Sequence, residues 1–149
     1  MNDDNNTATE VFGFFTEIGI INQLATALLA KSLPDGVHPS HFSILNHLVR
    51  MGDGKPPVRI ASAMQVTKNT MTHSLQVLQD RGYITVKPDP DDGRGKQVYL
   101  TDAGRNFREQ AIARATDAIG NIVGADQLAI MRRTRADLKE MRKHLDQHR

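Results

Sequence analysis

The chain has 149 residues, enough for one domain with additional helices, and its formal net charge is only +2. It contains no cysteine, which excludes disulfides, thiolate catalysis, thiol-based redox sensing and cysteine-ligated zinc. No run approaches about 18 uninterrupted apolar residues, and the acidic, polar start "MNDDNNTATE" is unlike a signal peptide, so we expect a soluble, cytoplasmic protein without a membrane span.

The first predicted helix covers residues 7–31. Thr7 and Glu10 form the T-x-x-E pattern of a capping box, so residues 1–6 are expected to fray. Apolar residues recur at helical spacing as far as "LPDG", which ends the helix. This helix is more apolar than an outer helix needs to be. It is buried either by the rest of the domain or in a dimer interface, and we favour the dimer.

Three helices are predicted next, separated by short turns. Pro39 suits the first turn of the second helix, and His38 before it would be a weak N-cap. "MGDGKPP" closes this helix, and a short helix follows over residues 58–64. The helix that begins after the N-cap Thr67 has an apolar stripe and ends at "DRG", with Gly82 at the C′ position.

Two strands and two helices complete the chain. Apolar and polar residues alternate over residues 84–87 and 97–100, which is typical of strands that are buried on one face. Thr101 is the predicted cap of a long helix, and "GAD" separates it from a last helix that ends near Leu145. The basic run in this last helix could be a nucleic-acid tail, but its apolar stripe favours an amphipathic dimer helix.

The order of helix, short helix, tight turn, capped helix and hairpin is that of a winged helix-turn-helix. The second helix of this motif places its N-terminal residues at base edges in the major groove, and the hairpin reaches a minor groove. No carboxylate occurs between Lys68 and Gln79, and the alternative is a merely solvated polar face. The outward polar residues, which we expect to contact bases or phosphates, are Thr67, Lys68, Asn69, Thr70, Thr72, His73 and Gln76.

The runs "IASAMQVTKNTMTHSLQVLQDRGYI" and "DDGRGKQVYLTDAG" resemble the MarR family of winged helix-turn-helix transcriptional regulators. The pattern D-x-R-x-K-x-V-x-L-T-x-x-G carries the resemblance, which extends over the whole chain. It implies a mainly α (α+β) fold with one domain over residues 1–149. In this domain a winged helix-turn-helix DNA-binding lobe (38–101) is flanked by N- and C-terminal dimerisation helices (7–31 and 102–147). The recognition helix would be residues 67–81 and the wing residues 83–101.

The same resemblance implies a homodimer that binds a palindromic operator in double-stranded DNA, usually as a repressor released by a small-molecule effector. Arg94 would be the wing arginine that enters the minor groove, supported by Lys96. Two departures lower the positive charge: Gly93 stands where the family often has a second arginine, and His73 where arginine is common. Gln65 replaces a frequent glycine and would cost about 1 kcal/mol if that position needs positive φ.

The acidic wing loop "PDPDDGRGK" needs an explanation if it meets DNA. We expect Asp92 to hold the Arg94 guanidinium in a charge-assisted pair, so that the loop presents one aimed cation. Asp89 and Asp91 are expected to face away from phosphate.

Other sites are weaker. The resemblance implies an effector pocket near the dimer helices, and its candidate lining residues, which could equally be plain core, are Phe14, Phe15, His38 and Phe42. The histidines near the second helix and in the last helix lack acidic or thiol partners, so no metal site and no cofactor are expected. "GDG" and "GRG" lack the strand–loop–helix setting of a phosphate-binding loop, and no nucleophile–base pair is present, so no enzyme is expected. The alternative function is a winged-helix protein-interaction module without DNA binding.

Overall fold

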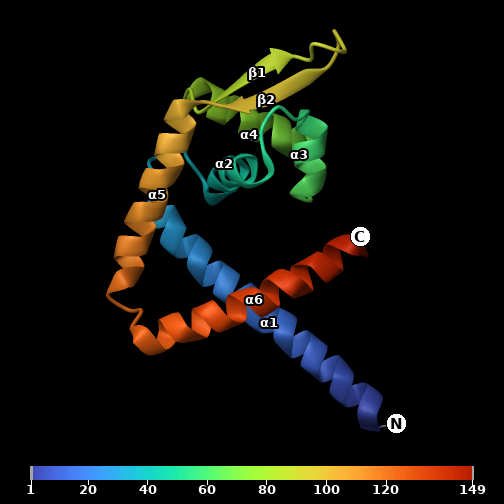
Figure 1. Cartoon of the computed structure of the whole chain (residues 1–149), viewed down its shortest axis with the longest axis vertical. Coiled ribbons are helices and arrows are strands. Elements are labelled where there is room, and N and C mark those ends of the chain that lie inside the picture. The colour runs from blue at the N-terminus through green and yellow to red at the C-terminus, as the bar shows by residue number, and fades with distance from the viewer. Residues whose placement is uncertain (1, 149) are drawn as a thin grey trace. The chain divides into compact units, whose positions relative to one another are not determined.

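The computed structural model describes residues 2–148, with side chains from Asn6 onward. The chain forms two compact units, one up to Ala115 and one from Thr116, and each is considered by itself. The elements, labelled in Figure 1, are α1 (Asn2–Lys31), α2 (Pro39–Met51), α3 (Pro57–Ala63), α4 (Lys68–Asp80), β1 (Ile84–Pro88), β2 (Lys96–Leu100), α5 (Asp102–Gly120) and α6 (Ala125–Gln147). This is the predicted mainly helical fold with a winged helix-turn-helix.

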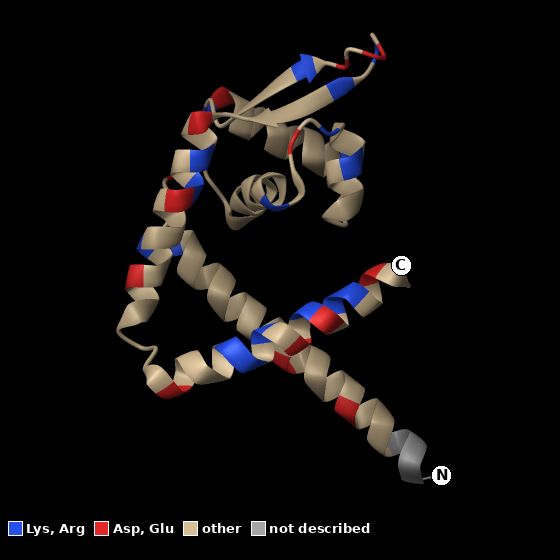
Figure 2. Cartoon of the chain, viewed as in Figure 1, with Lys and Arg blue, Asp and Glu red and all other residues tan. Residues whose placement is uncertain are grey.

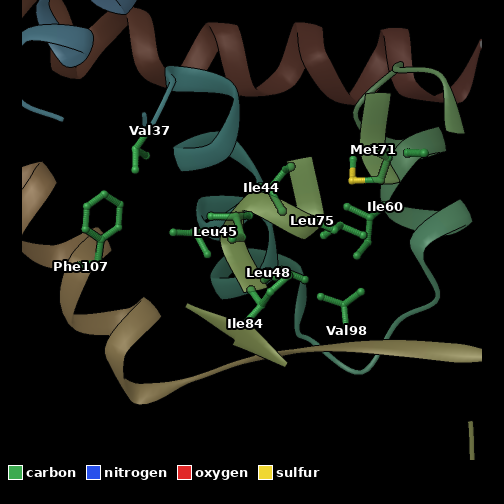
Figure 3. Packing of buried hydrophobic residues seen from close by; sticks show 12 residues of the cluster. Val37, Ile44, Leu45, Leu48, Ile60, Met71, Leu75, Ile84, Val98 and Phe107 are labelled. Atoms are coloured by element: carbon green, nitrogen blue, oxygen red, sulfur yellow. The ribbon is translucent and has the colours of Figure 1, made fainter. Parts of the chain in front are cut away.

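The core of the first unit lies where α2, α3, α4 and the two strands meet. Leu45, Ile60 and Leu78 have no exposed surface, and they come from three different helices. Ile84 and Val98 add one side chain from each strand, and Figure 3 shows these groups pointing toward one another. The predicted buried stripe of α4 is confirmed, since Met71, Leu75 and Leu78 are all buried. The core therefore fixes which face of α4 is left to solvent.

α1 begins at Asn2, so the prediction that residues 1–6 fray before a capping box at Thr7 is wrong from Asn2 onward. Glu10 lies within the helix, where its carboxylate accepts a hydrogen bond from the Asn6 side chain at 3.2 Å. Neither glycine nor proline occurs before Thr7, so nothing in the local sequence stops the helix from extending.

The wing is an antiparallel hairpin that pairs Ile84 with Leu100 and Pro88 with Lys96. The segment before α3, predicted only as a loop, pairs with the free edge of β2. Gly54 donates its N–H to the Val98 carbonyl at 2.7 Å, and the Val98 N–H donates to Lys55 at 3.0 Å. The wing is thereby tied to the helix-turn-helix by backbone hydrogen bonds.

The junction of the wing with α5 is equally tight. Thr101 caps α5 as predicted, because its Oγ1 accepts the Gly104 N–H at 3.0 Å. A Cβ atom at Gly104 would lie 2.1 Å from the Tyr83 carbonyl oxygen, so only glycine fits there. The rings of Tyr83 and Phe107 stack with centroids 4.4 Å apart. These contacts hold the start of α5 against the wing.

α1 and α6 both carry apolar side chains that are exposed in the single chain. α6 has no buried residue among those described, although its sequence is amphipathic. Residues 6–31 of α1 are long and apolar enough, by length and composition alone, to cross a membrane, whereas the sequence analysis expected no such segment. An exposed apolar helix face is also typical of a subunit interface. The large exposed side chains of the two helices include Val11, Phe12, Ile21, Leu24, Leu128, Ile130, Met131 and Leu145.

Candidate nucleic-acid interface

The tight turn before α4 holds a strained residue. Gln65 has φ +55°, and it is the one non-glycine residue with a positive φ among those described. The position therefore does require the positive φ at which a glutamine is less favourable than a glycine. Its side-chain Nε2 donates to the Ser62 carbonyl at 3.0 Å, which partly offsets the strain. Thr67 then caps α4: its Oγ1 accepts the Thr70 N–H at 3.1 Å and lies 2.8 Å from the Thr70 hydroxyl. The first turn of α4 is thus rigidly set.

All seven predicted residues of the recognition helix are exposed on the face opposite the core. Besides Thr67 and Thr70, two of them make side-chain hydrogen bonds within the helix. The Thr72 hydroxyl donates to the Lys68 carbonyl at 2.9 Å, and Gln76 Nε2 donates to Asp80 at 2.7 Å. Thr72 Oγ1 keeps its acceptor capacity and Gln76 keeps its amide oxygen and a second N–H, so both can still bond a base or a phosphate.

The aspartates of the wing loop bind backbone amides. Asp92 Oδ1 accepts the backbone N–H of Arg94 at 3.0 Å, and Asp89 Oδ1 accepts that of Asp91 at 3.0 Å. The expected pair between Asp92 and the Arg94 guanidinium is therefore not the contact that forms. A backbone amide two residues ahead is within reach of a short carboxylate without ordering a long side chain. The acids shape the loop, and Arg94 remains exposed.

A groove of about 510 Å³ joins α4 to the wing. It brings together five of the predicted residues: Lys68, Thr72, Gln76, Arg94 and Lys96. The other predicted residues of α4 (Thr67, Asn69, Thr70 and His73) lie outside this groove. The sequence analysis missed part of its wall, although the doubled proline at the start of α3 marks an exposed helix end. The missed lining residues are Pro56, Pro57, Val58, Leu75, Gln79, Val86 and Gly95.

The charge of the groove is of one sign. Lys68, Arg94 and Lys96 line it, and no carboxylate does. Figure 2 shows blue segments on both strands of the wing, with the acidic residues confined to the loop beyond them. A groove with this charge, lined by hydroxyl and amide groups, has the chemistry that binds a nucleic-acid backbone.

The four candidate effector residues are not united by any described contact. Phe14 and Phe15 form an edge-to-face pair on α1, with ring centroids 5.5 Å apart. His38 lies 5.4 Å from the ring of His41, and Phe42 is buried. Among residues 6–148, no three His, Asp or Glu side chains are grouped so that they could hold a metal ion.

His41 was overlooked as a structural residue. It is 4% exposed, and its Nδ1 accepts the backbone N–H of His38 at 3.1 Å. Burial lowers the pKa of His41, and the nearby His38, His73 and Arg81 lower it further. His38 occupies the predicted N-cap position, but the ring of His41 provides the hydrogen bond there.

The amino-acid sequence is similar to that of known transcriptional regulators. A family model described as the MarR family matches residues 35–95, from the connector before α2 to the wing loop. An uncharacterised HTH-type transcriptional regulator of Bacillus subtilis (strain 168), YkoM, is 26% identical over 82 residues, which are 55% of this chain and 53% of that protein. The match thus spans about half the length of this curated relative.

Solved structures match over most of the chain. Transcriptional regulator Tm0710 of Thermotoga maritima aligns with a TM-score of 0.66 and 26% identity, over 91% of this chain and 97% of the other. A MarR-family regulator of Rhodococcus sp. RHA1 aligns at 0.72 and 22%, over 89% and 93%. A mutant MarR from E. coli complexed with operator DNA aligns at 0.62 and 24%, over 87% and 95%. The last two likenesses, below 25% identity, concern the fold alone. YkoM and Tm0710 are both described as transcriptional regulators.

Proposed function

We propose that the chain is a transcriptional regulator of the MarR family that binds double-stranded DNA in a sequence-specific manner, a proposal supported by the family model that matches residues 35–95. The observation that carries the proposal is the groove between α4 and the wing, with three cations, three polar side chains of α4 (Thr72, Gln76 and Gln79) and no carboxylate. α4 would enter the major groove with its capped N-terminal turn at the base edges. Arg94 would enter the neighbouring minor groove, where negative potential is concentrated. A protein with the same fold has been solved on operator DNA.

We further propose that two copies assemble through α1 and α6 and bind a palindromic operator. Large apolar side chains are exposed on both helices, including Ile21 at 63% and Ile130 at 51%. The two helices also differ in charge, which favours their contact across an interface. Residues 2–31 contain four acids and one lysine, whereas residues 125–147 contain six Lys or Arg and four acids. A dimer would place half-sites about one helical turn apart.

The finer regulatory role follows from the family alone. We propose a cytoplasmic repressor that a small molecule releases from DNA, with Phe14, Phe15, His38 and Phe42 as candidate contacts. No described geometry selects the effector. A screen for compounds that release the protein from its operator is the direct approach.

The decisive variant is Arg94→Ala. Operator fragments are first selected from genomic DNA, and affinity is then measured by titration of a labelled fragment at about 0.1 M salt. Loss of the wing cation should weaken binding about ten-fold or more. Arg50→Ala serves as control, because Arg50 is exposed at the end of α2 and lies outside the groove. This control should bind as the parent does.

Equal affinity of Arg94→Ala and the parent would contradict the wing assignment. A correctly folded parent that selects no genomic DNA at low salt would instead favour the winged-helix protein-interaction module.

A further inference from the structure

Two arginines from distant elements hold the connector between α1 and α2. Arg114 of α5 donates its Nε–H to the Ser32 carbonyl at 3.0 Å. Arg81, the C-cap of α4, donates from Nη2 to the Asp35 carbonyl. The connector is thereby bound at its start by α5 and at its middle by the recognition helix. α4 and α5 therefore both contact the connector, at carbonyls that lie three residues apart.

Gly36 makes the second of these contacts possible. Its φ is +78°, and a Cβ atom there would lie 2.7 Å from Arg81 Nη2. The guanidinium thus packs directly on the connector backbone, where a Cβ atom would displace it. Gly52 has a similar φ of +81° but nothing within 4 Å of its Cβ position. The two glycines share a backbone requirement, and only Gly36 adds a steric one.

The connector is also anchored to the core beside this contact. The Val37 N–H donates to the Pro34 carbonyl at 3.1 Å, and Val37 itself is 5% exposed within the hydrophobic cluster. α2 begins at once with the His38–His41 hydrogen bond. Because the connector is fixed at both ends and contacts Arg81 at the end of α4, it can couple the orientation of α4 to that of α1.

We propose that Arg81 is a positioning residue: through the Asp35 carbonyl it sets the orientation of the recognition helix relative to α1, and thereby the half-site spacing that the dimer accepts. The inference rests on the proposed function. In a two-fold dimer built on α1, the separation of the two recognition helices depends on the angle at which each α4 is held. One base pair corresponds to about 3.4 Å along the duplex, so a small rotation of α4 changes the matching operator.

The test compares Arg81→Ala, Gly36→Ala and their double variant with the parent. Affinity is measured on the selected operator and on two versions with the half-sites one base pair closer or farther apart. The parent should prefer its own spacing by about ten-fold, the typical effect of a misplaced base contact. In Arg81→Ala and in Gly36→Ala this preference for the parental spacing should fall to about three-fold or less. The double variant should show the same preference as Arg81→Ala, because both changes break the same contact.

Gly52→Ala is the matched control, since its φ is also positive but no guanidinium lies near its Cβ position, and it should keep the parental preference. Arg94→Ala should weaken binding at all spacings alike. Three results would each overturn the inference. The first is an unchanged spacing preference in Arg81→Ala. The second is an equal loss of affinity at all spacings in Arg81→Ala, which would indicate a phosphate contact. The third is a loss of spacing preference in the double variant that equals the sum of the two single effects. A parent that selects no DNA would overturn the proposed function and this inference with it, whereas a parent that binds while Arg81→Ala keeps its preference would overturn the inference alone.

Discussion

Asp89 and Asp92 show how acids can belong to a surface that meets a polyanion. Each carboxylate accepts the backbone N–H two residues ahead, at 3.0 Å. The loop closes further through the Gly95 N–H, which donates to the Asp92 carbonyl at 2.8 Å. A Cβ atom at Gly95 would lie 2.9 Å from that of Asp89, so the loop is compact. Asp92 stabilises the loop by accepting a hydrogen bond, whereas its negative charge is expected to repel phosphate and to lower the affinity for DNA.

Asparagine at position 92 separates the two effects. Asp92→Asn keeps an acceptor for the Arg94 N–H and removes the charge, so operator affinity should stay equal or rise by about two- to five-fold. Asp92→Ala loses the turn and should bind several-fold more weakly than Asp92→Asn. Titration of labelled operator checks both.

The neighbouring Asp91 provides the control for this comparison. Its backbone N–H donates to Asp89, but no hydrogen bond to its own carboxylate is among the described contacts of the loop. Asn and Ala at position 91 should therefore bind operator equally. If Asn and Ala were also equivalent at position 92, the turn would contribute nothing to DNA binding.

At the scale of elements, the start of α2 depends on an imidazole. His41 stands at the N3 position, and its Nδ1 accepts the N-cap N–H in the way that Glu or Gln does in a capping box. A nitrogen that accepts a hydrogen bond carries no proton, so this bond requires neutral His41. Burial in first place, then the nearby His38, His73 and Arg81, lowers the pKa of His41, which favours the neutral ring.

The lowered pKa of His41 predicts a stability that falls in acid. Below its ordinary pKa of 6.5 the unfolded chain binds a proton that folded His41 resists, so its stabilising effect is present above that pH and is lost as the pH falls. The melting temperature should drop between about pH 7.5 and about pH 5.5. His41→Gln keeps an acceptor that does not titrate and should flatten the dependence.

Part of the dependence should remain in His41→Gln, because burial, with Arg50 and Lys55 nearby, also lowers the pKa of His47. His144→Gln, a change on the exposed face of α6, should leave the parental slope intact. Parallel melting curves for His41→Gln and the parent across this pH range would refute the role given to His41.

At the scale of the whole molecule, the proposed second copy would cover the exposed apolar faces of α1 and α6. Chains that expose this much apolar helix surface seldom remain single in water. The wing and α4 already have a complete core of their own, whereas α6 has no buried residue among those described. Assembly would therefore complete the burial that the single chain leaves unfinished.

Ile21→Glu should disrupt the dimer. Ile21 is 63% exposed in the single chain, and a carboxylate placed in an apolar interface without a partner is strongly unfavourable. Sedimentation equilibrium should give the monomer mass, and operator binding should fall with it. Val58→Glu is the matched control: Val58 is 59% exposed but lines the groove between α4 and the wing.

Val58→Glu should remain dimeric and lose DNA binding through the added charge. A dimer mass for Ile21→Glu, equal to that of the parent, would remove α1 from the interface.

The amino-acid sequence by itself determined the order of the elements, the caps at Thr67 and Thr101, the buried stripe of α4 and the exposed polar face opposite it. Periodicity and capping act over a few residues, so one stretch of sequence contains all that decides them. It also identified all three cations of the groove, Lys68, Arg94 and Lys96, because the patterns of the recognition helix and of the wing are local. The start of α1 was misjudged, since a capping pattern does not exclude a helix that begins earlier.

Only the tertiary structure decided which distant groups meet. The contact of Arg81 with the Asp35 carbonyl spans 46 positions, and that of the Leu100 N–H with Asp53 Oδ2 spans 47. The pairing of Lys55 with Val98 and the wall that Pro56 and Val58 add to the groove are of the same kind. These contacts form because close packing of one core brings the elements together. The local sequence around either residue does not indicate which distant residue it will contact.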